Sequence, residues 1–446
     1  MDKQGGNFLS RKLGLFPITN IVVANMIGAG IFTTSGLLMA DLRDPVLMLG
    51  LWIVAGIIAL AGAMCYGEIG ASIPKAGGEY AFLSSLFSTR LGFLSGWVSF
   101  VVGFSAPIAA SSIGFSEYLY RAVPGIFDMP LLGVDGMKKL YSILIIASFT
   151  LIHLKGIEFG ARVQNYLTML KVVLVIGLVL FGFSLGNGDF THLKMPIQES
   201  GDPVTWKTLG LSLMWIMFAF SGWNASVYIG SEIKKPEKNI PRSLLLGTGL
   251  VLLLYLLLNL LFIYAIPPVE MKDVISIGGL AVGKLFGASY EAFFSLLVAF
   301  ALFSSISAFI ILGPRVYYAM SSDGHFFKFA SRIHKKYQVP TYSIIFQGII
   351  SVVIILSGTF DQILTYMGFS LGIFPIITVF GLFKLRQKGL SKLKLPGYPL
   401  TPILFILTSV IMLVLSFMER PVESSIAILT ILVGIPAYYL FGKSKE

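Results

Sequence analysis

The sequence predicts an all-α integral membrane protein with about twelve transmembrane helices. Hydrophobic residues make up 56% of the 446-residue chain, charged residues make up 12%, and the mean hydropathy is +0.84. A soluble protein of this size could not bury so much apolar surface. Stretches such as residues 250–262 are apolar on all sides instead of alternating with polar residues, which excludes a transmembrane β-barrel.

Five apolar stretches of roughly the 20 residues that span ~30 Å of hydrocarbon precede residue 185. Asp41 and Asp44 end the first stretch, and a polar connection over residues 72–90 separates the second from the third. The expected spans of this first five-helix unit, residues 14–184, are 14–39, 46–71, 91–120, 140–154 and 161–184. Residues 1–13 form the N-terminal segment that precedes it.

Seven further spans follow in the same way. A polar connection over residues 267–288 corresponds to the one at 72–90, because each follows the second span of its half. The expected spans are 209–231, 243–266, 289–320, 342–357 and 361–383, which form a second five-helix unit, and then 402–418 and 424–441. The last two lie outside the repeat in a unit covering residues 402–441, and residues 442–446 form the C-terminal segment.

Basic residues predict the orientation of these spans. They crowd the even-numbered connections, and by the positive-inside rule these connections and both termini are cytoplasmic. The main clusters are Lys234, Lys235, Lys238 and Arg242; Lys328, Arg332, Lys335 and Lys336; and Lys384, Arg386, Lys388, Lys392 and Lys394. The formal net charge of +11 is then a topology signal and a contact with anionic membrane lipids, not a nucleic-acid footprint. We expect a multi-pass protein of a bacterial plasma (inner) membrane.

The first and sixth spans each contain residues that favour a break in the helix. The first carries Gly28, Ala29 and Gly30 at its midpoint, and the sixth carries Ser221, Gly222 and Asn224, with the break expected at 221–225. A break frees backbone groups that hydrocarbon cannot satisfy, so it persists only where it lines a polar cavity or a ligand. Free N–H groups near Gly28–Gly30 would bind a carboxylate without a cationic side chain.

Carbonyls freed on the other side of each break, around Met26, Ile27, Phe218 and Ser221, are acceptors for an ammonium group. A zwitterion satisfies both sets, so the sequence predicts a transporter of small zwitterions. Five crossings separate the two breaks, which makes the two helices antiparallel and predicts a 5+5 inverted repeat. The alternative explanation of the glycines is close helix packing. A dinucleotide loop is a poor match, because Thr33 replaces the third glycine and no strand precedes it.

The residues that usually carry catalysis or bind metal form no cluster, so we expect no catalytic site, no metal and no cofactor. Cys65 is the single cysteine, and the four histidines are His153, His192, His325 and His334. The acids Glu68, Glu117, Glu232 and Glu291 lie toward helix ends, where they are expected to cap, pair locally or shape gates instead of binding substrate. A membrane enzyme is therefore disfavoured, whereas a channel or a transport-derived sensor stays open.

Four motifs resemble the amino acid–polyamine–organocation superfamily, and within it the L-type amino acid transporters and their bacterial homologues. They are Ile27-Gly28-Ala29-Gly30-Ile31-Phe32, Cys65-Tyr66-Gly67-Glu68 with residues 74–80, Phe218-Ala219-Phe220-Ser221-Gly222-Trp223-Asn224, and residues 232–242. The resemblance implies a LeuT-like core of five plus five helices. It implies that Phe218 is an aromatic gate and that Asn224 couples the broken sixth helix to the substrate.

Lys171 lies about 13 Å into the fifth span, counting from Arg162, and a charge that deep is usually functional. The resemblance implies that it replaces a sodium ion and bonds to carbonyls of the broken first helix; the alternative is that it snorkels to the headgroups.

Phe218, Phe220, Ser221 and Asn224 outline a pocket with no central carboxylate, which favours a neutral side chain.

We therefore expect a sodium-independent secondary transporter of neutral L-amino acids that works by alternating access as an exchanger. The alternatives are a proton-coupled symporter and a transporter of cationic amino acids or polyamines. Animal L-type transporters join a heavy chain by a disulfide from the loop that corresponds to residues 121–139. That loop has no cysteine here, so no disulfide-linked heavy chain is expected. The sequence makes no prediction of oligomeric state.

Overall fold

The computed structural model describes residues 11–197, 204–274, 276–357 and 360–442. In this part of the chain the regular elements are helical, and two isolated β-bridges join Leu13 to Ile233 and Ala76 to Ile229. Nine of the described helices are long and apolar enough to cross a membrane. Three expected spans remain. The span 140–154 corresponds to α7 (Gly133–His153), 209–231 to α9 (Trp206–Ala219) with the residues after it, and 342–357 to α14 (Thr341–Ser357).

The first half of the chain forms eight α-helices. They are α1 (Leu15–Met26), α2 (Ala29–Leu42), α3 (Pro45–Ser72), α4 (Glu79–Leu86), α5 (Thr89–Val98), α6 (Ser105–Ala122), α7 (Gly133–His153) and α8 (Ile157–Leu185). A π-helical turn, η1 (Ser99–Gly103), joins α5 to α6, and short 3-10 turns form η2 (Pro124–Phe127) and η3 (Phe190–Lys194). The expected third span, 91–120, thus corresponds to α5 and α6 with a π-helical turn between them.

The second half of the described chain forms nine α-helices. Its α-helices are α9 (Trp206–Ala219), α10 (Pro236–Ala265), α11 (Pro268–Met271), α12 (Ile277–Phe286), α13 (Ala288–Ser322), α14 (Thr341–Ser357), α15 (Phe360–Gln387), α16 (Leu400–Glu419) and α17 (Pro421–Gly442). The 3-10 turns are η4 (Ala225–Tyr228), η5 (Gly230–Glu232) and η6 (Lys328–Ser331). The expected sixth span is therefore α-helical only as far as Ala219.

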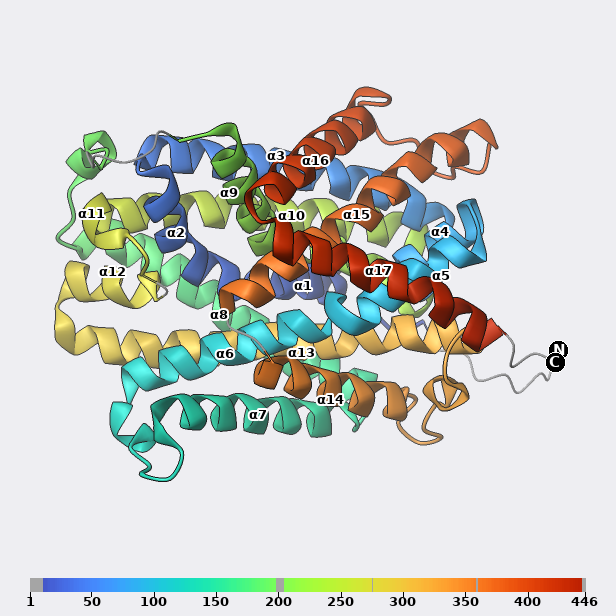
Figure 1. Cartoon of the computed structure of the whole chain (residues 1–446), viewed down its shortest axis with the longest axis horizontal. Helices are drawn as coiled ribbons and strands as arrows, with labels where there is room; N and C mark the ends of the chain where they lie inside the picture. The colour runs from blue at the N-terminus through green and yellow to red at the C-terminus, as the bar shows by residue number, and fades with distance from the viewer. Residues whose placement is uncertain (1–10, 198–203, 275, 358–359, 443–446) are drawn as a thin grey trace.

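Most helices run along the long axis of the molecule, with α11 and α12 at one end and α4 and α5 toward the other (Figure 1). Large apolar side chains are exposed around the outside; Leu400, Val422 and Leu440 are at least two-thirds exposed. Because a water-facing surface of this kind favours aggregation, the exposed apolar belt fits a hydrocarbon environment. The chain is a multi-pass membrane protein.

The two interrupted helices cross in opposite directions at the centre of the bundle. The first half of one contacts the second half of the other: α1 contacts η4, and α2 contacts α9. Gly30 lies so close to Ala219 that a Cβ on Gly30 would be 2.6 Å from the Ala219 Cα. Glycine is required at this crossing because any side chain would force the two backbones apart.

Candidate functional site

The first helix is interrupted at Ile27 and Gly28. The helix α1 ends at Met26 and α2 begins at Ala29, so the break lies at the start of the stretch expected at 28–30, and Ala29 and Gly30 form the first turn of α2. Gly28 is in an extended conformation, with φ −130° and ψ −154°. The interruption leaves carbonyls of the last turn of α1 without helical donors.

Lys171, on α8, supplies those donors. Its Nζ lies 3.3 Å from the Ala24 carbonyl oxygen, hydrogen-bonds the Ile27 carbonyl and lies 2.8 Å from Ser305 Oγ on α13. Ser305 in turn lies 3.1 Å from the Ala24 oxygen and 2.9 Å from the Ile27 oxygen. An ammonium has three N–H donors, and all three have partners here although the side chain is fully buried. Lys171 thus fastens the break to α8 and α13, which is the contact that the resemblance implied.

The second interruption follows Ala219. A turn over residues 220–224 leads into η4 and η5, and Gly222 has φ +103°, a conformation that L side chains rarely adopt. Gly222 lies directly against Asn25, so even a methyl group would collide with that residue. The second break therefore needs glycine at this position for both its conformation and its contact with α1.

Tyr255, on α10, links the two breaks. Its hydroxyl hydrogen-bonds the Met26 carbonyl of the first helix and lies 2.8 Å from the Ala219 carbonyl of the sixth. A hydroxyl has one hydrogen, so these two carbonyls share a single donor. Sequence reasoning missed this residue because it lies in the all-apolar stretch 250–262, where no period marks which side chain faces the breaks.

We expect Tyr255→Phe to lower about tenfold the initial rate of the transport that the sequence predicts, because two buried carbonyls then lose their shared donor. Tyr264→Phe is the matched control: it makes the same change on the same helix and removes a 3.2 Å hydrogen bond to the Gly186 carbonyl, away from both breaks. Uptake of labelled substrate into liposomes measures both variants. Equal rates for the two variants would contradict a linking role for Tyr255.

A cavity of about 100 Å³, large enough for several water molecules, lies beside the second break. Four of the residues expected at the site line it: Phe218, Ser221, Gly222 and Asn224. Asn25, Ser99, Phe104 and Tyr228 also line it, together with residues of α13, α15 and α16. Met26, Ile27, Gly28, Ala29 and Gly30 are buried and do not line the cavity in this conformation. The structure therefore brings four of the expected sixth-span residues to the cavity, whereas the expected first-break residues are away from its surface.

The expectation of a cavity without a carboxylate is wrong, because Glu79 lines it. Glu79 is the first residue of α4, a short helix that is not among the candidate spans. Its Oε1 accepts hydrogen bonds from Tyr66 Oη at 2.7 Å and from Asn224 Nδ2 at 3.0 Å. Burial raises the pKa of Glu79 to about 7, and hydrogen bonds from Tyr66, Tyr228 and Asn224 partly offset that rise.

Sequence reasoning missed Glu79 because it falls in the 72–90 connection, which polarity alone assigns to the cytoplasm. The local signal is the pair Gly77 and Gly78, with φ of +100° and +53°. This turn brings the chain back beneath the bundle, where the Gly77 N–H donates to the Tyr228 carbonyl at 3.0 Å. Two adjacent glycines before a helix therefore carry the acid inward.

Each of the four acids expected near helix ends pairs with a basic side chain from another element, and not with a local partner. Arg315 Nε lies 3.0 Å from Glu232 with both side chains 2% exposed, Lys138 lies 2.8 Å from Glu117, and Arg121 lies 3.1 Å from Glu291. None of these acids lines the cavity described above. Within the described ranges, no group of three His, Cys, Asp or Glu residues is placed to hold a metal ion.

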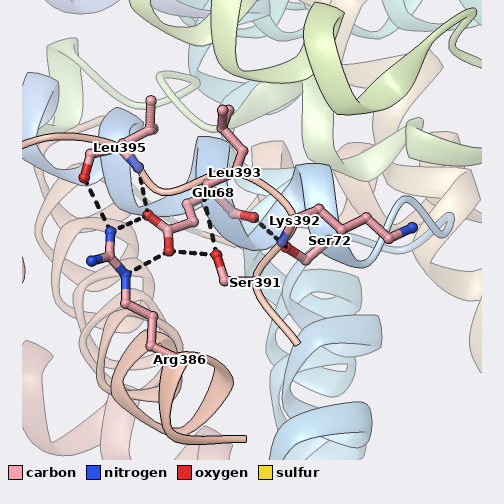
Figure 2. A network of polar contacts seen from close by, with 7 residues as sticks. All are labelled: Glu68, Ser72, Arg386, Ser391, Lys392, Leu393 and Leu395. Carbon is pink, nitrogen blue, oxygen red and sulfur yellow. Dashed lines mark hydrogen bonds and ion pairs between the residues drawn. The ribbon is translucent and has the colours of Figure 1, made fainter. Parts of the chain in front are cut away.

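Glu68 has the most elaborate set of partners (Figure 2). Arg386 binds it in a bidentate manner, with Nε and Nη2 each 2.6 Å from a carboxylate oxygen. Ser391 Oγ donates to the same carboxylate at 2.7 Å and the Leu395 N–H at 3.0 Å. Ser72, one turn after Glu68, accepts from the Lys392 N–H at 3.1 Å. This Glu68 cluster fastens the end of α3 to the end of α15 and to the connection that leads into α16.

Comparison with known proteins adds to this geometry. Residues 13–436 match the family model described as amino acid permease. The serine/threonine exchanger SteT of Bacillus subtilis (strain 168) is 27% identical over 448 residues, which cover 98% of each chain. The b(0,+)-type amino acid transporter 1 of Mus musculus is 29% identical over 442 residues, 97% of this chain and 88% of that relative. The large neutral amino acids transporter small subunit 2 of Homo sapiens is 27% identical over 446 residues, 98% of this chain and 81% of that relative.

Proposed function

The chain belongs to the amino acid permease family, and from that premise we propose that it is a sodium-independent exchanger of neutral L-amino acids that works by alternating access. That it resembles the L-type transporters and their bacterial homologues is confirmed, as is its assignment as an amino acid transporter and not an enzyme. The substrate's charge, the driving force and the exchange mode belong to the proposal.

The observation that carries the proposal is the contact of Lys171 with the first break. Its ammonium lies among the Ala24 and Ile27 carbonyls and the Ser305 hydroxyl, a set of oxygens of the kind that would otherwise bind a hard cation. Because a fixed charge already fills this position, a sodium ion has no place there. Transport is then driven by exchange of one amino acid for another.

The substrate is placed by the backbone groups of the two breaks. Its carboxylate would bind N–H groups at Gly28, Ala29 and Gly30, where the positive end of α2 lies. Its ammonium would bind carbonyls around Met26, Phe218 and Ser221, because the Ile27 carbonyl already accepts from Lys171 and Ser305. In this conformation the Gly28–Gly30 segment is covered, so substrate binding requires the two interrupted helices to separate. Phe218, at the cavity wall, would act as the gate.

Alternating access would come from rocking of the first, second, sixth and seventh spans against the others. Contacts among these elements support a single moving unit: α3 and α1 both contact α10, and α2 contacts α9. The proposal includes twelve spans, a 5+5 inverted repeat followed by two helices, and cytoplasmic termini in a bacterial inner membrane. It includes no disulfide-linked partner, since the single cysteine, Cys65, is buried.

The names of the relatives support exchange of amino acids, since one of them is a serine/threonine exchanger and another transports large neutral amino acids. A second candidate is proton-coupled symport, which the buried Glu79 favours because its raised pKa lies within the physiological range. A cationic substrate is the third candidate, with the Glu79 carboxylate as its partner.

Exchange from preloaded liposomes separates these candidates. Vesicles containing alanine, serine, leucine or arginine are given labelled alanine, and uptake is compared with that of empty vesicles. We expect the neutral amino acids to stimulate uptake several-fold and arginine not to do so, with no change when sodium is replaced by choline. Stimulation by arginine alone would overturn the neutral assignment. Equal uptake by empty vesicles would contradict exchange, and uptake driven by an inward proton gradient would favour symport.

A further inference from the structure

The Asn224 amide has a fixed orientation at the cavity wall. Its Nδ2 donates to Glu79 Oε1 at 3.0 Å and to Tyr228 Oη at 3.3 Å. An amide nitrogen has two hydrogens, so both donors of Asn224 are engaged within the protein. The remaining polar atom, Oδ1, accepts no hydrogen bond from the residues that the structure describes, although Asn224 lines the cavity.

Glu79 determines this orientation. An ionised carboxylate accepts hydrogen bonds and cannot donate them, so the Asn224 atom beside Glu79 has to be the nitrogen. The other neighbours agree with this assignment: Tyr66 Oη donates to Glu79 at 2.7 Å, and Tyr228 Oη accepts from Asn224 while its own hydrogen is available to Glu79. Tyr66 Oη and Asn224 Nδ2 both donate to the Glu79 carboxylate, and the second Asn224 hydrogen is donated to Tyr228.

We propose that Glu79 is a positioning residue that fixes the Asn224 amide so that the cavity presents the Oδ1 acceptor and selects substrates whose side chain donates a hydrogen bond, such as serine or threonine. This inference rests on the proposed amino acid transport. A substrate that lacks the donor leaves Oδ1 unpaired in a mostly apolar cavity, which weakens its binding relative to a substrate that carries one.

Serine and alanine test this selectivity because they differ by one hydroxyl oxygen. Both carry the same ammonium and carboxylate, whose contributions to binding are equal. The ratio of their inhibition constants, Ki(Ala)/Ki(Ser), measured against one labelled substrate, therefore reports the contribution of the hydroxyl. We expect a ratio of roughly 2 to 12 for the wild type, the range for one neutral hydrogen bond. A ratio of one would overturn the inference.

Glu79→Gln tests whether the charge of Glu79 orients the Asn224 amide or whether a side chain of this size at position 79 is sufficient. A glutamine presents both a donor and an acceptor, so the Asn224 amide can lie in either orientation and the serine preference is expected to fall toward one. Adding Asn224→Asp to Glu79→Gln is expected to restore the preference, because an aspartate presents an oxygen to the cavity in both orientations while glutamine donates to the other oxygen. Glu237→Gln, the same change at an exposed position on α10, is the control and should keep the wild-type ratio.

The pH profile provides a readout that a merely structural role would not change. Burial raises the pKa of Glu79 to about 7, so the carboxylate is ionised at pH 8 and largely protonated at pH 6. The titratable groups in contact with it are the phenols of Tyr66 from α3 and Tyr228 from η4. A phenol ordinarily titrates near pH 10, so the carboxyl is the group in this cluster that changes charge between pH 6 and pH 8. Protonation gives Glu79 a donor and frees the amide to turn. The serine preference of the wild type should therefore be higher at pH 8 than at pH 6, and that of Glu79→Gln should not change.

These outcomes distinguish the inference from the function on which it rests. If wild-type liposomes take up no labelled amino acid, the proposed transport fails. If they exchange amino acids but Glu79→Gln keeps the wild-type ratio, or the double variant does not regain it, the positioning role is wrong. A loss of arginine binding alone in Glu79→Gln would show that Glu79 binds a substrate cation directly, which also overturns the inference. Elution as one species in size-exclusion chromatography verifies that each variant is folded.

Discussion

Replacing Lys171 with alanine is expected to lower the rate of amino acid exchange about 100-fold or more. The substitution removes three hydrogen bonds from a charged donor, two of them to the carbonyls of Ala24 and Ile27. Hydrogen bonds to charged groups contribute about 1.5–3 kcal/mol each, and about 1.4 kcal/mol corresponds to a tenfold change in rate. Initial uptake by preloaded liposomes measures the effect.

The control for Lys171→Ala is Lys388→Ala, which removes an exposed lysine after α15 and should leave exchange near the wild-type rate. Lys171→Arg keeps the charge, but a planar guanidinium cannot direct three donors at the same oxygens, so we also expect a large loss. Wild-type exchange should be the same in sodium and in choline buffers. Unchanged kinetics in Lys171→Ala, or a sodium requirement in the wild type, would refute the role proposed for this residue.

Replacing Arg386 with glutamine is expected to have the largest effect on stability. Glu68 has a side chain that is 1% exposed, and Arg386 is its cationic partner at 2.6 Å. Removing one member of a buried ion pair leaves the other charge uncompensated, which costs about 3–5 kcal/mol. The temperature of thermal unfolding in detergent should therefore fall clearly. The Arg386 side chain is 15% exposed, so Glu68→Gln, which leaves that cation next to solvent, should be milder.

The double variant Glu68→Gln/Arg386→Gln tests the cause of that effect. It removes both charges, so it should unfold at a higher temperature than Arg386→Gln alone. Arg420→Gln is the matched surface control. Its partner Glu423 lies 3.9 Å away and Arg420 is 46% exposed, so the loss should be within about 1 kcal/mol. A double variant less stable than Arg386→Gln would show that packing around Arg386, and not the charge, explains its effect.

The sequence predicted the features that depend on the membrane as a solvent. Gly28 and Gly222 mark the breaks because glycine within a hydrophobic span lowers the cost of leaving the helix. Lys171 was predicted to be functional from its depth alone, because a charge there needs specific partners. Its carbonyl partners on the first helix were implied by the resemblance, and the structure shows them. These inferences needed only the order of residues along one helix.

The partners supplied by distant segments could not be predicted in the same way. Ser305 reaches the first break from 278 residues away, and Tyr255 reaches it from 229. Each is one of several similar residues in its helix, and neither has a pattern that indicates which one faces inward. Glu79 was missed for a different reason, since its position depends on a turn within a connection and not on a helical period. Long-range packing decides these contacts.

The Glu68 cluster joins α3 to α15 and to the connection after it by more hydrogen bonds than join η5 to α13. Opening a passage between α3 and α15 would remove four hydrogen bonds from one carboxylate. Opening one between η5 and α13 would break the two hydrogen bonds that join Arg315 to Glu232. The second separation breaks fewer hydrogen bonds, so we expect the α3–α15 junction to stay closed while η5 moves relative to α13.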